Sequence, residues 1–539
     1  MSFLSMKFLL FLAAAVAGYY VIPKQLQWVW LLIFSYIFYL ASGPAAVVFI
    51  LTTTATTFLG GLWLEHTDRA LACALDRTLA RDPDRLRRPA NPQQPLSPDE
   101  KKALKARFKQ RKKWITALVL FVNFGILAAL KYRNFAADNM NLLFGTHFSS
   151  AKLLLPLGIS FYTFQSMGYL IDVYRGKYAP DRNPFRFALF VSFFPQILQG
   201  PIGRYDRLAS QLYGQKSFSL TRIERGLQLM LWGYFKKIVI ADRAAVVVSE
   251  VFGNYQSYGG ILVMAGVLCY SLQLYGDFSG GMDVIMGASE CFGISLDANF
   301  KRPYFAQSIS DFWHRWHITL GTWMKDYVFY PFSLSKGMNK FGKYCKKHFS
   351  KHVSRVLPVC IANLLVFFLV GVWHGPAWKF IVYGLYNGII IAASSLLAPI
   401  YTQMARKLHI PAESRTWTVV RILRTFLLVN ISWYFDMAES LGAALTMMKN
   451  TIAGFTLSAL TDGSLLRLGL DLKDYGALSL SCAGLFAVSL LQENHVSMRD
   501  ALAAKPLAAR WCVYLMLLFS IPLLGQITMT GGGFIYAQF

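Results

Sequence analysis

The sequence predicts an all-α polytopic membrane protein with roughly 11 to 12 transmembrane helices, plus re-entrant and interfacial helices around a central cavity. Hydrophobic residues make up 55% of the 539 residues and aromatic residues 15%, which is too apolar for an ordinary soluble enzyme. Apolar runs long enough to cross a bilayer recur along the chain, for example at residues 30–64 and 114–130. Other runs are shorter or are interrupted by glycine and proline, so the number of spans is approximate.

The distribution of charge sets the expected orientation. A net charge of +26 would suggest a nucleic-acid partner in a soluble protein, but here the basic residues cluster in loops. Residues 65–113 carry 14 Lys and Arg against 7 Asp and Glu, and residues 333–355 carry seven basic residues and no acidic one. Such loops stay in the cytoplasm. We therefore expect a multi-pass protein of the cytoplasmic (inner) membrane, surrounded by lipid, without a nucleic-acid partner and with its N-terminus outside.

The N-terminal region, residues 1–64, contains three expected spans. The first apolar run, residues 8–22, follows a single basic residue and is followed at once by a second span, so we interpret it as a retained helix. Residues 65–113 form a polar, basic loop whose end, PDEKKALKARFKQRKKW, is helical in character. Attraction to the anionic cytoplasmic surface explains this stretch better than a docking role.

The core is expected to occupy residues 114–436. Four stretches with glycine or proline interrupt its apolar helices: LPLGISFYTFQSMGYLIDVYRG, FFPQILQGPIGRY, YGDFSGGMD and GVWHGPAW. Helix breaks at membrane depth leave backbone amides unpaired, and they are tolerated only where protein or a water-filled cavity satisfies them. The four stretches therefore predict a central cavity. Residues 437–539 follow, with an interfacial segment up to residue 475 and spans near 476–491 and 511–528.

His374 is the first candidate for chemistry. It follows an apolar helix and stands directly before a Gly-Pro break, at a depth well inside the bilayer. A buried histidine is often no more than a hydrogen-bonding partner of a neighbouring helix. The adjacent break and the preceding Trp373 favour a base that lines a cavity.

His317 is the second candidate, within DFWHRWHITLGTW. On a helical wheel, residues 311–327 form one amphipathic helix, with Phe312, Trp316, Leu320, Trp323 and Tyr327 on one face. An aromatic stripe of this kind is typical of a membrane interface. His317, beside Trp313 and Met324, is less easily explained in that way, and His314 is a weaker candidate.

Other polar residues leave their roles open. Asp277 and Ser279 could orient a histidine, bind a hydroxyl or cap a broken helix. Gln196 and Arg204, with Gln199, surround a Gly-Pro turn and suit either an interhelical contact or substrate binding. His348 and His352 have the spacing of a metal pair but lie in a cationic loop, which favours solvated side chains. The seven cysteines are scattered without a CxxC pair, so neither a metal site nor a disulfide framework is expected.

The sequence contains no nucleotide-binding loop, HExxH or GxSxG motif. Two histidines in an apolar channel suggest direct acyl transfer instead. One histidine would take the proton of an acceptor hydroxyl, whose oxygen attacks an activated acyl group. This chemistry requires no bound cofactor and uses an acyl thioester as co-substrate.

Taken together and in chain order, GPIGRY, DFSGGMD, NFKRPY, DFWHRWHITLGTW and GVWHGPAW resemble the membrane-bound O-acyltransferases, in particular the branch of bacterial alginate O-acetyltransferases and the related enzymes of teichoic-acid D-alanylation. The resemblance covers about residues 153–436, and the last residues, GGGFIYAQF, also fit. It implies that His317 and His374 are the active-site histidines, and it adds Asn299 and Trp313 to the candidates for substrate binding. It also implies a funnel across the membrane, a cytoplasmic donor such as acetyl-CoA, and a cell-surface polysaccharide or an extracytoplasmic acyltransferase as acceptor.

The stretch WYFDMAES, residues 433–440, departs from the FFRAES-like pattern of this family, since Asp436 and Met437 replace Phe and Arg. The loop at 65–113 is extra relative to the usually shorter D-alanylation enzymes. Both departures favour the O-acetylation branch and leave the acceptor open; an exported polysaccharide is the acceptor that we expect. Transfer of D-alanyl or another acyl group to a cell-wall polymer, acylation of a lipid or sterol, and a transporter with broken helices remain alternatives.

Overall fold

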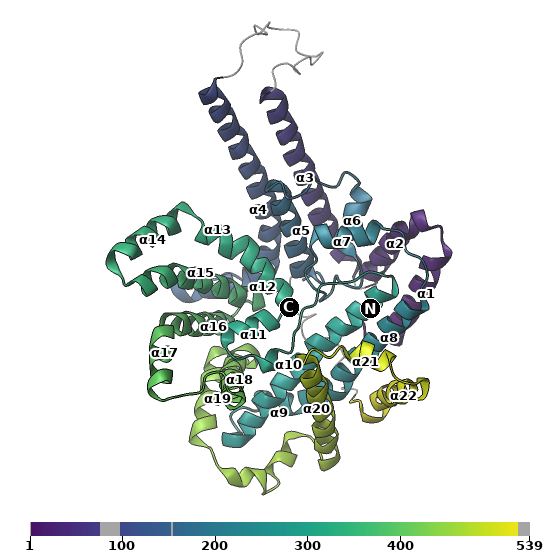
Figure 1. The fold of residues 1–539 in the computed structure, drawn as a ribbon, viewed down its shortest axis with the longest axis vertical. Coiled ribbons are helices and arrows are strands. Elements are labelled where there is room, and N and C mark those ends of the chain that lie inside the picture. Colours follow the sequence, from purple (N-terminus) through teal and green to yellow (C-terminus); the bar gives the residue numbers. More distant parts are fainter. Residues whose placement is uncertain (1, 42, 76–96, 152–154, 527–539) are drawn as a thin grey trace.

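The computed structural model describes residues 2–41, 43–75, 97–151 and 155–526. Regular structure in these ranges is helical, apart from one isolated bridge between Phe300 and Trp316 (Figure 1). The predicted all-α fold is therefore confirmed. The middle of the 65–113 loop, residues 76–96, and the last residues, GGGFIYAQF, lie outside the described residues.

Eight helices in the described ranges are long and apolar enough to cross a membrane. They are α3 (Val47–Leu75, directly after the short η2, Pro44–Ala46), α4 (Pro98–Phe144), α10 (Gly260–Cys291), α15 (Lys351–His374), α16 (Trp378–Leu396), α18 (Arg415–Met437), α20 (Leu472–Glu493) and α22 (Leu507–Leu524). Three further apolar helices are shorter, namely α1 (Met6–Val21), α2 (Gln27–Leu40) and α5 (Ile159–Tyr174). Large apolar side chains are exposed on many of these helices, and α22 buries none of its residues, as expected for surfaces that face lipid.

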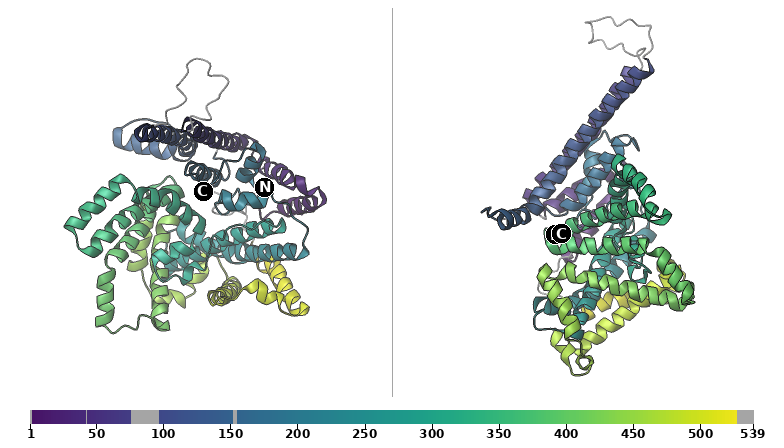
Figure 2. Two further views of the ribbon diagram at one scale, coloured as in Figure 1. Left: turned by 45° about the horizontal axis from the view of Figure 1, so that its top comes forward. Right: turned by 90° about the vertical axis from the view of Figure 1, so that its left-hand side faces the viewer.

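The basic stretch before residue 114 is the beginning of α4. This helix has 47 residues and starts with a capping box, in which Ser97 and Glu100 satisfy each other's backbone N–H groups. Figures 1 and 2 show that α3 and α4 extend together beyond the body of the molecule. An ion pair between Lys112 and Asp68, at 2.8 Å, joins them. The predicted helix is present in this stretch, and it is continuous with the membrane-spanning part of α4 that follows.

One of the predicted helix breaks is absent, because α10 runs through it. YGDFSGGMD lies inside a continuous helix from Gly260 to Cys291, so the expectation of a broken helix here is wrong. Its glycines allow close packing against α8 (Leu220–Tyr234): a Cβ at Gly280 would lie 2.7 Å from the carbonyl oxygen of Gly233. Small residues at such positions let two helices approach each other without interrupting either.

Two other predicted breaks are present. Residues 193–204 leave the helical conformation between α6 (Pro184–Ser192) and α7 (Tyr205–Tyr213), and residues 375–377 separate α15 from α16. Each contains proline, which removes a backbone donor and clashes with the preceding helical turn. The residues before α5 are also non-helical, where Gly158 has a φ of 71° and a Cβ would meet the carbonyl oxygen of Ile197 at 2.0 Å. The rest of that stretch is the buried helix α5.

The remaining elements surround this core (Figure 1). The lysines of residues 333–355 lie mainly on α14 (Lys336–His348) and on the start of α15, at one edge of the molecule. The interfacial segment predicted after residue 437 consists of α19 (Leu441–Ala453) and short 3-10 turns. The other elements are η1 (Lys24–Leu26), the π-helix η3 (Phe235–Ala241), α9 (Asp242–Gly253), η4 (Pro303–Phe305), α13 (Tyr330–Ser333), α17 (Ala398–Lys407), η6 (Leu457–Leu460), η7 (Ser464–Leu468) and α21 (Met498–Ala503).

Candidate active site

His317 lies at a break between two short helices. The expected single helix over residues 311–327 is wrong: α11 (Ile309–Arg315) and α12 (Ile318–Met324) are separate, and the π-helical η5 (Lys325–Phe329) follows. The chain pairs here with a segment that lies about 15 residues earlier. The N–H of Ile318 donates to the carbonyl of Asn299 at 3.0 Å, and the N–H of Lys301 to that of Arg315 at 2.9 Å. This pairing removes the helical hydrogen bonds and leaves His317 in the left-handed region, with a φ of 47°.

The side chain of Asn299 fixes the imidazole of His317. Its Oδ1 accepts hydrogen bonds from the backbone N–H and the hydroxyl of Thr319, at 3.0 and 2.9 Å, which identifies this atom as the amide oxygen. Nδ1 of His317 lies 3.3 Å from the same oxygen. Nδ1 therefore carries the proton, and Nε2 keeps the lone pair. His317 itself is 2% exposed, so burial favours its neutral form.

His374 is the last residue of α15 and is also 2% exposed. Its ring lies against Tyr383, with 4.9 Å between ring centroids. The indole of Trp373 packs against both candidate histidines, with 5.2 Å between its ring centroid and that of His374 and 5.5 Å to that of His317. The structure thus brings together two histidines that are far apart in the sequence, with one aromatic ring packed against both.

A residue that the sequence did not nominate for the site completes the surroundings of His374. Oδ1 of Asp436, on α18, lies 3.3 Å from Nδ1 of His374, and both side chains are buried. The other oxygen of this carboxylate accepts a hydrogen bond from the hydroxyl of Tyr270 at 2.7 Å. The sequence did contain a sign of this role, because burying a carboxylate in an apolar helix costs free energy and such residues usually have a function. The sequence could not show which helix would face it.

Two lysines hold the ends of the helices that carry this pair. Lys131 of α4 donates to the carbonyl of Trp373 at 2.6 Å, at the end of α15. Lys379 of α16 donates to the carbonyls of Asp436 and Ala438, at 3.0 and 2.6 Å, at the end of α18. A cation at a helix C-terminus satisfies free carbonyl groups and interacts favourably with the helix dipole.

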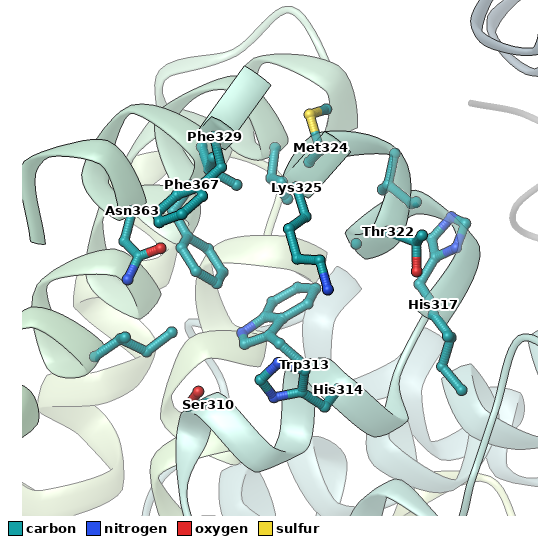
Figure 3. A pocket seen from close by; sticks show the side chains of 16 residues that line it. Ser310, Trp313, His314, His317, Thr322, Met324, Lys325, Phe329, Asn363 and Phe367 are labelled. Carbon is teal, nitrogen blue, oxygen red and sulfur yellow. The ribbon is translucent and has the colours of Figure 1, made fainter. Parts of the chain in front are cut away.

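A cavity of about 230 Å³ adjoins His317, between the α11–α12 segment and α15 (Figure 3). Most of its lining is apolar or aromatic, and Trp313 forms one wall, where its indole N–H donates to Asn387 at 3.1 Å. Lys325, His314 and Ser310 are among the polar side chains of the lining labelled in Figure 3. An apolar cavity with a few polar groups and a buried histidine is the usual form of a small-molecule site.

Asp277 and Ser279 have cationic partners. Asp277 is fully buried and forms an ion pair with Lys237, and the hydroxyl of Ser279 accepts a hydrogen bond from Lys236 at 2.8 Å. Both lysines lie on the π-helix η3. Phe278, between these two residues in α10, packs edge-on against the ring of His317 with 4.9 Å between centroids. The DFS stretch thus connects this charged cluster to the candidate site through its aromatic residue.

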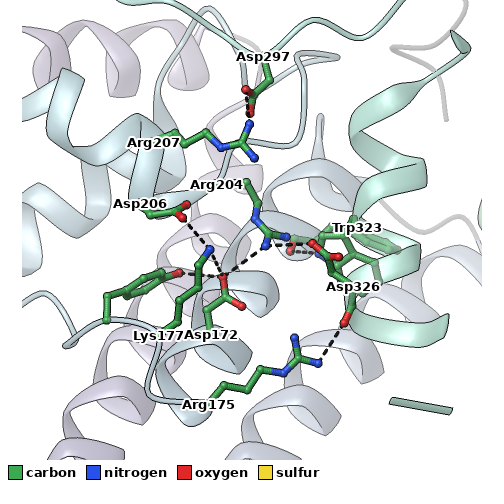
Figure 4. Close-up of polar contacts among 11 residues, drawn as sticks. Asp172, Arg175, Lys177, Arg204, Asp206, Arg207, Asp297, Trp323 and Asp326 are labelled. Carbon is green, nitrogen blue, oxygen red and sulfur yellow. Dashed lines mark hydrogen bonds and ion pairs between the residues drawn. The ribbon is translucent and has the colours of Figure 1, made fainter. Parts of the chain in front are cut away.

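Gln196 and Arg204 lie in polar clusters away from the cavity lining. The amide of Gln196 donates to Gln165 within the buried 193–204 region. Arg204 forms ion pairs with Asp326 at 3.1 Å and with Asp172 at 3.7 Å (Figure 4). This network connects η5 to α5 and to the turn after residue 200, so it supports the segment that carries His317.

A nearby carboxyl belongs to the same network. Burial raises the pKa of Asp206, but the ion pair with Lys177, at 2.6 Å, and the positive charges of Arg204 and Arg207 together lower it further. The net pKa lies below the ordinary value, so this carboxylate stays ionised at neutral pH.

His348 and His352 of the basic stretch have partners of their own, apart from the cavity and the Arg204 network. The ring of His348 packs against Tyr344, and Nε2 of His352 lies 3.1 Å from the carbonyl oxygen of Ser395.

The fold and the site define a class of protein: a polytopic helical membrane protein with two buried histidines packed against one indole, of which His317 lines an apolar cavity and His374 does not. Residues 179–435 match the model of MBOAT, the membrane-bound O-acyltransferase family. The predicted resemblance to this family is confirmed over these residues.

Curated relatives agree with this assignment. The chain is 34% identical over 346 residues to the probable alginate O-acetylase AlgI of Azotobacter vinelandii, which is 63% of each chain. It is 34% identical over 362 residues to the peptidoglycan O-acetyltransferase of Helicobacter pylori, covering 62% of this chain and 64% of that protein. It is 29% identical over 299 residues to the teichoic acid D-alanyltransferase of Bacillus subtilis, covering 53% and 70%. The match therefore spans just under two thirds of the O-acetylating relatives.

Proposed function

We propose that this protein is a membrane-embedded O-acyltransferase that moves an acetyl group from a cytoplasmic thioester towards an exported cell-surface polysaccharide. The observation that carries the proposal is the pair of buried histidines, His317 and His374, packed against one indole, with His317 lining an apolar cavity. A transporter with broken helices would need polar groups at membrane depth as well, but it would have no need of two neighbouring imidazoles.

The reaction assigns one role to each histidine. His374 acts as general base and takes the proton of the acceptor hydroxyl while the hydroxyl oxygen attacks the thioester carbonyl. The tetrahedral intermediate then collapses, the C–S bond breaks, and the departing thiolate is protonated to a thiol. The proton that His374 took from the hydroxyl passes to the sulfur through Nε2 of His317, whose imidazole is held by Asn299 at the cavity, so both imidazoles return to their neutral forms.

The cavity beside His317 suits the thioester end of a donor. Its volume of about 230 Å³ is too small for a whole nucleotide-bearing molecule, so the rest of the donor would lie outside it. Trp313 supplies an aromatic wall, and Lys325 supplies a positive charge at the lining. Acetyl-CoA is the donor that we propose, and the exclusion of water around the histidines limits its wasteful hydrolysis.

The acceptor follows from the relatives. Two are named for O-acetylation of alginate and of peptidoglycan, which supports a polysaccharide as the final target. The direct acceptor is the polymer itself or an extracytoplasmic acyltransferase that delivers to it. We propose that the protein lies in the inner membrane with its donor side in the cytoplasm and its N-terminus outside. The basic stretches 65–113 and 333–355 support this orientation.

Transfer of D-alanine is the second candidate, because the teichoic acid D-alanyltransferase is matched over 70% of its own length. The two candidates differ in the mass and charge of the transferred group. Mass spectrometry of the esters released from cell-envelope polymers separates them, since a D-alanyl ester carries an amine and an acetyl ester does not.

The test uses the purified protein in lipid vesicles with radiolabelled acetyl-CoA and envelope polysaccharide. We expect transfer by the wild type and a loss on the order of 10²-fold in His374→Ala, with the variant still folded in the membrane. Transfer within about threefold of the wild type would show that His374 is structural. Absence of acetyl transfer, together with D-alanyl ester in the cell envelope, would favour the second candidate.

A further inference from the structure

We infer that Asp436 is a positioning residue that orients the imidazole of His374 for proton transfer. The inference rests on the proposed function, in which His374 is the base. It starts from the contact between the carboxylate of Asp436 and Nδ1 of His374, at 3.3 Å, where both side chains are at most 5% exposed.

The two oxygens of the carboxylate have separate partners. Oδ2 accepts the hydrogen bond of the Tyr270 hydroxyl at 2.7 Å, which fixes the rotation of the carboxylate. Oδ1 then faces Nδ1 of His374. The 3.3 Å contact lies at ion-pair distance and does not meet hydrogen-bond geometry. Catalytic hydrogen bonds are often long or poorly aligned before substrate binds. The hydroxyl of Tyr270 thus orients the carboxylate of Asp436, and this carboxylate orients the imidazole of His374.

This order determines which nitrogen of His374 can act as base. A carboxylate accepts but does not donate, so Nδ1 carries the proton and Nε2 keeps the lone pair. When Nε2 takes the proton of the acceptor hydroxyl, the ring becomes a cation next to an anion that is already in place. The proton stays on the imidazole and Asp436 stays ionised, as in other carboxylate–imidazole pairs.

A simpler role for Asp436 is to join α10 to α18, and the structure offers a direct comparison for it. The next residue of α10, Ser271, donates its hydroxyl hydrogen to Asn430 of α18 at 2.8 Å. This second bond joins the same two helices, and its groups are buried to the same degree. A buried amide is sufficient for that purpose, whereas a buried carboxylate has a high desolvation cost and needs a cationic or hydrogen-bonding partner.

The experiment measures kcat and KM for acetyl transfer in reconstituted vesicles. We expect Asp436→Asn, which keeps the shape of the side chain but lacks the charge, to lower kcat by about 10- to 100-fold and to leave KM for the donor within about threefold. Asp436→Glu should recover part of this loss because it restores the carboxylate. Tyr270→Phe should lower kcat less, since the carboxylate remains but is less firmly oriented.

The matched controls are Ser271→Ala and Asn430→Ala, which remove the neighbouring bond between α10 and α18. We expect both to keep kcat within about threefold of the wild type. If they lower kcat as much as Asp436→Asn does, or if Asp436→Asn has no effect, Asp436 serves packing and the inference is wrong.

The outcome for His374→Ala separates this inference from the proposed function. Loss of transfer in His374→Ala with near-normal transfer in Asp436→Asn rejects the positioning role alone. Full transfer in His374→Ala, or no transfer by the wild type, rejects the proposed mechanism and with it the role of Asp436. Parallel losses in His374→Ala and Asp436→Asn, with normal controls and partial recovery by Asp436→Glu, support both.

Discussion

Replacement of Gly280 by alanine tests how tightly the centre of the molecule is packed. The added Cβ would lie 2.7 Å from the carbonyl oxygen of Gly233, whereas ordinary contacts begin near 3.4 Å. The obstacle is backbone on a neighbouring helix, so no side-chain rotation can relieve it. The facing helices α8 and α10 must therefore separate by about 0.7 Å at this point, the difference between these two distances. Overpacking of this kind costs about 1–3 kcal/mol in the free energy of unfolding.

The assay is unfolding of the purified protein in mixed micelles titrated with sodium dodecyl sulfate, followed by tryptophan fluorescence. The matched control is Gly484→Ala in the interior of α20, where an added Cβ meets nothing within 4 Å. There the substitution removes only the conformational freedom of glycine, and we expect a gain of about 0.5–1 kcal/mol.

The displacement should also reach the candidate site. Phe278 lies two residues before Gly280 on α10 and packs against His317 at 4.9 Å. We therefore expect Gly280→Ala to lower acetyl transfer as well as stability, whereas Gly484→Ala changes neither adversely. If Gly280→Ala is as stable as Gly484→Ala, the close approach of the two helices does not contribute to the fold as reasoned here.

Three further predictions concern the site, the buried charges and the orientation. His317→Gln should lower acetyl transfer by about 10²-fold. Near-normal turnover would show that residues 311–327 serve only as an aromatic segment at the membrane interface. Lys237→Met should destabilise the protein by about 3–5 kcal/mol because it removes the ammonium that pairs with both Asp277 and Asp242, and the double variant Lys237→Met/Asp277→Leu should recover only part of the loss in the same unfolding titration. Cysteines introduced at exposed positions of residues 333–355 should resist a membrane-impermeant thiol reagent in intact cells, and efficient labelling from outside would reverse the proposed topology.

The sequence predicted the breaks that contain proline correctly and the glycine-only break wrongly, for a physical reason. The stretches around Pro195 and Pro376 are non-helical as expected, because proline lacks the donor that a helix requires. DFSGGMD contains glycine without proline, so its backbone hydrogen bonds can all form. Its glycines serve the contact with α8, and that partner helix is invisible in the local pattern.

The same limit applies to the candidate site. The sequence nominated His317 and His374 separately, but their common contact with Trp373 depends on how α12 and α15 meet. The break at His317 was missed because the residues on both sides have helical periodicity. The pairing with residues 299–301 that interrupts the helix is a tertiary effect. Asp436 was visible as a departure from the family pattern, but the packing of α18 against α10 and α16 is what brings it to His374 at the end of α15.

The left-handed backbone at His317 has a consequence for protein engineering. A histidine with a φ of 47° holds its conformation at a cost of about 1–3 kcal/mol, which asparagine or glycine would reduce. A library selected only for expression and heat resistance should therefore drift towards those residues at this position. The most durable variants of such a library would be the least useful as catalysts, so selection for durability has to be coupled to a screen for acyl transfer.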